Sequence, residues 1–167
     1  IEHKGKRLTF CPWGTELYEI PDDSDIVFGH FEIETFQFNA FKICSEGIKS
    51  KDLLKKCNLI ITGHFHLREE RKYKTGNILY LGNPFQMDFG DVNSVKGYYI
   101  LDTINKTYEF TENNISPKHV KLKLSDLARV GRLTNETKNN IKNNILRFII
   151  DKSITPDEVD IVLKKFS

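Results

Sequence analysis

The chain has 167 residues, enough for one domain or for one domain and part of a second. Hydrophobic residues make up 39% and charged residues 29%, so the chain can bury a core and is neither disordered nor fibrous. No apolar run reaches the roughly 18–20 residues that a membrane-spanning helix needs. A net charge of +2 neither requires nor excludes a nucleic-acid partner. The three cysteines include no C-x-x-C pair, which argues against a disulfide framework and favours a reducing cytoplasm.

The first third of the chain predicts the strands of a sheet that is covered on both faces. Residues 7–12 have a strand pattern, and residues 26–28 are consecutive and apolar, as in a buried strand. Residues 50–57 predict a short helix with Ser50 as its N-cap, and residues 58–62 predict a second buried strand. A connection of about thirty residues that contains a helix is typical of parallel strands, so we expect an α/β fold.

The pattern changes after residue 67, and from there we expect a meander of antiparallel strands. Apolar residues gather in short runs separated by turn signals, and the last run alternates apolar and polar residues. The expected strands are residues 77–81, 96–101, 107–110 and 120–124.

We expect a domain boundary between residues 127 and 128, because an asparagine-rich stretch with few large apolar residues begins there. Residues 1–127 would form one domain, and residues 128–167 would be a linker and the start of a second, an α+β tail. In that tail, residues 145–150 predict a strand. Thr155-Pro-Asp-Glu158 is a capping box with proline at the first helical position.

The helix after the capping box has an apolar stripe that requires a partner surface. We expect the rest of the chain to leave little apolar surface for it, so the tail should be exposed or loosely docked. The chain opens at Ile1, not at a methionine, and ends directly after this helix, so we expect it to be a piece of a longer protein. The stripe consists of Val159, Val162, Leu163 and Phe166.

Two segments share one layout, in which an apolar strand is followed by Gly-His-Phe. They are Gly29-His30-Phe31-Glu32 and Gly63-His64-Phe65-His66. Functional groups gather at the carboxyl ends of strands in α/β sheets, and a glycine lets a neighbouring group approach the backbone closely. We therefore expect His30 and His64 to lie together at one edge of the sheet.

His64 and His66 would lie on the same side of an extended chain, roughly 6–7 Å apart at a rise of about 3.3 Å per residue. That separation suits two metal ions about 3.5–4 Å apart better than one. Imidazole suits manganese, iron, zinc and nickel. The alternative for any one of these residues is a structural histidine, and for the isolated His3 and His119 we adopt that interpretation.

The two Gly-His segments resemble the last two metal-binding motifs of the calcineurin-like metallophosphoesterases. The resemblance implies the C-terminal half of a four-layer β-sandwich with flanking helices. It also implies two divalent metal ions, most often Mn²⁺, with His30 and His64 on one ion and His66 on the other.

A second set of motifs covers most of the chain: Phe10-Cys-Pro-Trp13, the aromatic segment after His30, the run from Tyr80 to Gln86, Gly90-Asp91 and the run from Lys96 to Asp102. These motifs are similar to those of the SbcD/Mre-type DNA repair nucleases and their phage members. This resemblance implies a DNA exonuclease or endonuclease of recombination and double-strand break repair, with an SMC-like ATPase of the SbcC/Rad type and a second copy as partners. It also implies a location in the cytoplasm, which for a phage protein is that of the host cell. From about residue 116 it implies the start of a DNA-binding capping domain.

The chain lacks the motifs Asp-x-His, Gly-Asp-x-x-Asp and Gly-Asn-His-Asp of that family's first half. The resemblance therefore implies three metal ligands and no catalytic residue here, and we expect the isolated chain to be inactive. Two alternatives stay open: a part of another phosphoesterase, acting on phosphoproteins or small phosphodiesters, or a non-catalytic binding fragment.

The remaining polar and aromatic features receive a structural interpretation, and no DNA-binding residue is assigned. The basic run from Arg68 to Lys74 predicts a solvated loop, with contact to DNA phosphates as the alternative. Asp88 and Asp91 predict a turn, and Trp13 and the phenylalanines predict core positions.

Overall fold

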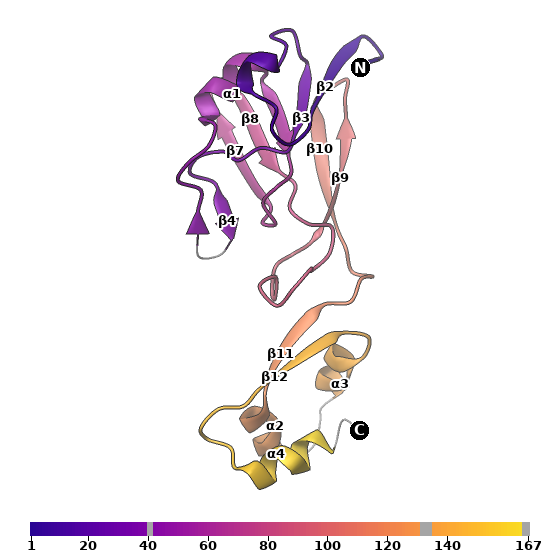
Figure 1. The fold of residues 1–167 in the computed structure, drawn as a ribbon. Coiled ribbons are helices and arrows are strands. Elements are labelled where there is room, and N and C mark those ends of the chain that lie inside the picture. The colour runs from indigo at the N-terminus through magenta and orange to yellow at the C-terminus, as the bar shows by residue number, and fades with distance from the viewer. Residues whose placement is uncertain (40–41, 131–134, 165–167) are drawn as a thin grey trace. The chain divides into compact units, whose positions relative to one another are not determined.

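The computed structural model describes residues 1–39, 42–130 and 135–164, and its fold is drawn in Figure 1. The chain forms two compact units. The sheet unit contains residues 1–84 and 95–113, and the C-terminal unit contains residues 85–94 and 114–167. Among the described residues, no helix has the length and apolar character needed to cross a bilayer.

A mixed six-stranded sheet is the centre of the sheet unit, with the order β1-β2-β3-β6-β8-β7. The four inner strands are parallel to one another, and each edge strand is antiparallel to its neighbour. The strands are β1 (Glu2–His3), β2 (Lys6–Cys11), β3 (Ile26–Gly29), β6 (Leu59–Thr62), β8 (Gly76–Tyr80) and β7 (Glu69–Tyr73). The α/β class expected from the sequence is present; the four-layer metallophosphoesterase sandwich stays a prediction.

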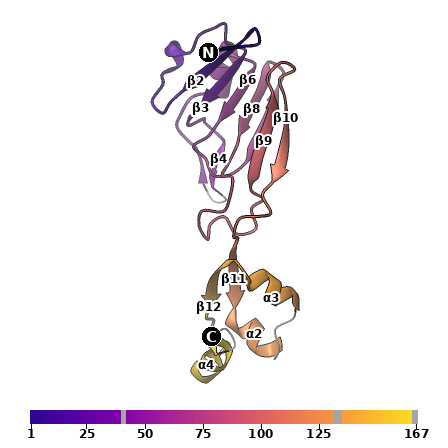
Figure 2. The same ribbon diagram turned by 90° about the vertical axis from the view of Figure 1, so that its right-hand side faces the viewer.

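Both faces of the sheet are covered, because alternate residues of its strands belong to two separate apolar clusters. Val27 and Ile60 pack with Leu53 of α1 (Ser50–Lys56). Ile26 and Ile61 lie in the other cluster, together with residues of the antiparallel hairpin β9 (Gly97–Asp102) and β10 (Thr107–Glu112). Figure 2 shows this hairpin beside the sheet. The consecutive apolar residues of β3 therefore predicted burial on both faces correctly.

Helix α1 follows the predicted span, but its cap differs. Ser50 is the first residue of the helix, and Lys49 occupies the N-cap position without a side-chain hydrogen bond. Leu53 and Leu54 are buried as predicted. Lys55 and Lys56 lie in the last turn, where positive charge is favourable.

The antiparallel meander expected after residue 67 is only partly correct. Strands β9 and β10 do form an antiparallel hairpin, but β8 joins the main sheet parallel to β6. The basic run, expected to be a loop, forms the edge strand β7, where charged side chains protect an exposed edge. Short elements complete this unit: η1 (Leu17–Glu19), β4 (Gln37–Asn39) and β5 (Lys42–Ile43).

The C-terminal unit is built on the parallel pair of β11 (His119–Lys123) and β12 (Ile145–Ile149). The sequence pattern groups residues 120–124 with the preceding strands and predicts a boundary between residues 127 and 128. The compact unit instead includes β11, because its only pairing among the described residues is with β12. The helices are α2 (Leu124–Val130), α3 (Asn135–Ile141) and α4 (Pro156–Leu163).

Helix α4 packs in a small core of its own unit, so the expected lack of a partner surface is wrong for Val162, whereas Leu163 of the same stripe is 39% exposed. Val162 is 1% exposed and lies in a cluster with Leu124 and Ile154, against which Val159 packs. Leu124 begins α2, a helix that the sequence reading missed. The capping box of Thr155 and Glu158 is confirmed, and Phe166 lies outside the described residues.

Candidate functional site

Two histidines lie together at the carboxyl edge of the main sheet. His30 follows β3 and His64 follows β6, and these neighbouring parallel strands pair Gly29 with Thr62. The ring centroids of His30 and His64 are 5.1 Å apart, and the rings are nearly perpendicular at 81°. The sheet topology thus brings together two residues that are far apart in the sequence.

Gly63 favours this close approach. A Cβ atom at this position would lie 3.2 Å from Nδ1 of His30, closer than side chains normally pack. The Gly63 N–H also donates to the Gly29 carbonyl oxygen at 3.0 Å, which ties the two Gly-His segments together. The glycine before His64 therefore makes room for the imidazole of His30.

The backbone of His64 lies in the left-handed region, with φ of 84°. This conformation is uncommon for a residue with a side chain, costs about 1–3 kcal/mol, and concentrates at functional sites. Strand β6 ends at Thr62, so the segment bends at His64. The extended geometry expected for His64 to His66 is therefore wrong, and the side chain of His66 is exposed.

The imidazole of His64 contacts a carboxylate and several aromatic rings. Nε2 of His64 lies 3.0 Å from Oε1 of Glu32. A carboxylate only accepts, so Nε2 donates this bond, which in the neutral imidazole leaves the lone pair on Nδ1. The indole of Trp13 stacks on the imidazole with centroids 4.6 Å apart and an interplanar angle of 23°. Phe38 and Phe65 also contact the ring.

Buried hydrogen bonds fix the loop that carries His30. The Phe31 N–H donates to Oγ1 of Thr62 at 3.0 Å. The hydroxyl of Tyr80 donates to the Phe31 carbonyl oxygen at 2.7 Å and accepts from the Ile33 N–H at 3.1 Å. Burial raises the pKa of Tyr80, so its hydroxyl stays a donor at neutral pH. The loop is thereby tied to both β6 and β8.

The segment after His64 is held by a buried lysine that sequence reasoning missed. Lys96 is 6% exposed, and its Nζ donates to the His66 carbonyl oxygen at 2.8 Å. The Asn83 N–H donates to the same oxygen at 3.4 Å. Lys96 opens the expected strand 96–101, and no pattern in the sequence indicated that its side chain is buried.

The three predicted ligands do not form a complete metal centre among the described residues. In residues 1–39, 42–130 and 135–164, no group of three or more His, Cys, Asp or Glu side chains is arranged to hold a metal ion. His30 and His64 come together, but the three histidines do not form such a group. The residues present therefore do not fit a self-contained metal site.

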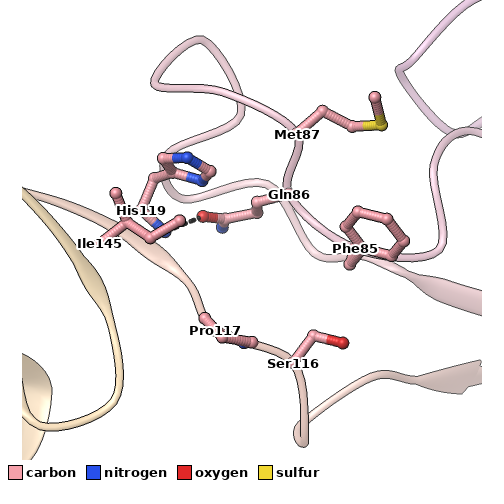
Figure 3. A pocket seen from close by; sticks show the side chains of 7 residues that line it. All are labelled: Phe85, Gln86, Met87, Ser116, Pro117, His119 and Ile145. Atoms are coloured by element: carbon pink, nitrogen blue, oxygen red, sulfur yellow. Dashed lines mark hydrogen bonds between the residues drawn. The ribbon is translucent and has the colours of Figure 1, made fainter.

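A second feature, a pocket of about 410 Å³, lies in the C-terminal unit (Figure 3). Oε1 of Gln86 accepts from the His119 N–H at 2.6 Å at its wall. His119 is 8% exposed, and its Nδ1 has no hydrogen-bond partner. His119 is one of the two isolated histidines for which the sequence favoured a structural interpretation. The apolar walls are Phe85, Met87, Pro117 and Ile145.

Asp88 and Asp91 close the turn that was predicted for them. Oδ1 of Asp88 accepts from the Gly90 N–H at 2.6 Å, and Oδ2 of Asp91 accepts from the Met87 N–H at 2.9 Å. Both carboxylates are thereby used in local backbone bonds.

Comparison with known proteins relates the chain to a phage nuclease. No family model matches the chain. Over 125 residues, 68% of the chain, it is 30% identical to exonuclease subunit 1 of Enterobacteria phage T4. The chain spans 34% of the length of that protein. The similarity agrees with the nuclease resemblance drawn from the motifs, at the level of a nuclease-related protein.

Proposed function

We propose that this chain is a section of a metal-dependent nuclease subunit that hydrolyses phosphodiester bonds in DNA. The observation that carries the proposal is the pair of His30 and His64 at the carboxyl ends of neighbouring parallel strands. Their ring centroids are 5.1 Å apart. The 30% identity to a phage exonuclease subunit supports DNA as the substrate over phosphoproteins or small phosphodiesters.

In this proposal, the residues of the chain supply one wall of the site. His30 and His64 present imidazoles, and Glu32 fixes the ring of His64 so that its Nδ1 lone pair stays available. We propose divalent metal ions, Mn²⁺ foremost, as the groups that these imidazoles help to bind, with His66 as a further ligand. The other ligands and the general acid would come from outside these residues, because the described residues contain no complete donor group.

The same proposal extends to partners. The phage protein is named as a subunit. We propose that the whole protein to which this chain belongs acts on DNA together with an SMC-like ATPase subunit and a second copy of itself, in the cytoplasm of a host cell.

A chimera tests the proposal. In it, this chain replaces the stretch of the T4 exonuclease subunit 1 that it matches, so that the rest of the phage protein supplies the missing part. We expect the purified chimera to degrade a DNA strand with Mn²⁺, while the isolated chain does not. His30→Ala or His64→Ala should lower the rate by about a hundredfold, because loss of a ligand disables a metal site at least as much as loss of a residue that orients one, which costs about 10–100-fold.

His3→Ala is the matched control, since His3 is an exposed histidine of the same unit. Far-UV circular dichroism and metal content check that the variants fold and bind metal. DNA hydrolysis that survives both substitutions would contradict the proposed site. Hydrolysis of a nitrophenyl phosphodiester without DNA hydrolysis would place the chain in another class of phosphoesterase.

A further inference from the structure

An exposed tryptophan stands directly beside the histidine pair. Trp13 is 60% exposed, contrary to the core position that the sequence reading gave it. One part of its surface stacks on His64, and its ring lies edge-on to His30 with centroids 5.9 Å apart. What sets Trp13 apart from other exposed hydrophobic side chains is that its ring contacts both histidines of the pair, so a ligand at the histidines can also reach the ring.

A tight turn presents this ring. The Thr15 N–H donates to the Pro12 carbonyl oxygen at 3.2 Å, and the hydroxyl of Thr15 donates to the same oxygen at 2.8 Å. Gly14, the residue after Trp13, has φ of 85°. A bond from the fourth residue to the first, with a positive φ at the third, defines a type II turn. Trp13 is therefore held at the second position of a turn that ends strand β2.

The charges near the ring are compatible with an anionic ligand. The ring of Phe38, 38% exposed, contacts His64, and Nζ of Lys42 lies 5.2 Å from the Phe38 centroid. The nearby carboxylate of Glu32 is bonded to His64. Exposed aromatic rings next to a cation form the surface on which proteins bind single-stranded nucleic acid.

We propose that Trp13 is a stacking platform for an unpaired nucleobase of the DNA strand whose phosphate lies at His30 and His64. This rests on the proposed function and identifies part of its substrate: a strand end or a single strand, because a base inside a duplex is already stacked. Base and phosphate of one nucleotide are joined by a single sugar, so both can reach neighbouring groups. Stacking is independent of base identity, so the platform confers no sequence preference.

The test uses the complete 167-residue chain in EDTA, so that hydrolysis plays no part. Trp13 is the single tryptophan, and its fluorescence therefore reports this position alone. The probes are a short oligothymidylate and a strand of equal length with abasic sugars. We expect the oligothymidylate to quench the fluorescence saturably and the abasic strand to leave it unchanged.

Fluorescence anisotropy of labelled strands measures affinity in the variants. Trp13→Ala should weaken oligothymidylate binding about tenfold, because stacking on one aromatic ring carries an effect of this order. Affinity for the abasic strand should stay the same, and Trp13→Phe should restore most of the loss. Tyr18→Ala is the matched control, since Tyr18 is an exposed aromatic residue of the same unit, 81% exposed.

Three results would overturn the platform: equal affinity of Trp13→Ala and the parent chain, equal quenching by both strands, or no binding of the oligothymidylate. None of them decides the proposed function, which depends on hydrolysis by the chimera. Conversely, an inactive chimera with intact base-dependent quenching would remove the nuclease proposal and leave a site that binds single strands.

Discussion

His64 combines a strained backbone with a side chain that makes several contacts. Its φ of 84° lies in the left-handed region, while its imidazole contacts Glu32 and Trp13. Such a conformation persists only when the surroundings enforce it. The contacts of the side chain, rather than the conformational preference of the backbone, therefore explain why this position is a histidine.

Replacing His64 by Ala and by Gly separates these two contributions. Both variants lose the imidazole, but only glycine adopts this positive φ without a steric penalty, because it has no Cβ. The free energy of unfolding of His64→Gly should therefore exceed that of His64→Ala by about 1 kcal/mol. Urea unfolding of the sheet unit measures the difference. Equal free energies of unfolding would mean that the segment relaxes to another backbone conformation and that the strain is absent in solution.

For single residues, the sequence predicted which side chains lie together better than it predicted their backbone conformation or exposure. The repeated Gly-His-Phe layout was enough to bring His30 to His64, because parallel strands end at one edge of a sheet. It could not reveal the bend at His64, since periodicity assumes a regular backbone. Nor could composition show that Trp13 is exposed, because that depends on the turn that Gly14 allows.

Strand β8 supports the site through one buried hydroxyl. Tyr80 is 0% exposed, and its hydroxyl bonds both Phe31 and Ile33 in the loop that carries His30. The contact joins β8 to the segment after β3, two elements that are not neighbours in the sheet. Loss of the hydroxyl would leave a buried N–H and a buried carbonyl without their partner.

We therefore expect Tyr80→Phe to lower the free energy of unfolding of the sheet unit by about 1–3 kcal/mol. Tyr73→Phe makes the same chemical change where the hydroxyl bonds Ser50 in an exposed position, and it should cost less than about 0.5 kcal/mol. Urea titrations of the two variants give both values. A Tyr80→Phe protein as stable as the control would show that the loop does not depend on β8.

Elements were predictable where the apolar pattern was strong. Strands β3 and β6 and helix α4 follow from apolar runs or a capping box. Strand β7 was missed because its residues are charged and its stability comes from pairing with β8. Helix α2 was missed because it follows β11 without any turn signal between them.

The C-terminal unit has a source of acid sensitivity in two carboxylates whose pKa values are lowered in the folded state. Hydrogen bonds from the hydroxyls of Ser125 and Ser153 lower the pKa of Asp151 to about 2. A backbone hydrogen bond from Thr155 also lowers the pKa of Glu158. Because the folded-state pKa lies below the unfolded one, this contribution to stability is present above about pH 4 and is lost as the pH falls to about 2.

Asp151→Asn should reduce that acid sensitivity. We expect the variant to be less stable than the parent chain at neutral pH and to lose less stability between pH 4 and pH 2. Hydrogen exchange of the β11 and β12 amides follows this unit separately. Asp160→Asn, at an exposed position of α4, is the control. An unchanged pH profile in Asp151→Asn would exclude the serine contacts as its cause.

The division into units was the least predictable property of the whole molecule. Residues 85–94 belong to the C-terminal unit, although the residues on both sides of them in the sequence belong to the sheet unit. The chain therefore passes from one unit to the other three times. A change in composition along the chain predicts a single boundary, and it cannot predict units that each consist of two separate segments. The identity of the two units as parts of a nuclease and its capping domain stays a prediction.

The three cysteines of the chain lie together in one apolar cluster of the sheet unit. Cys11, Cys44 and Cys57 are all buried, and burial raises the pKa of each thiol. The reactive thiolate is therefore scarce at neutral pH, and an alkylating reagent can reach these sulfurs only when the sheet unit opens. The C-terminal unit contains no cysteine. The rate of alkylation consequently measures how often the unit that carries the histidines opens. Unfolding confined to the C-terminal unit leaves this rate unchanged.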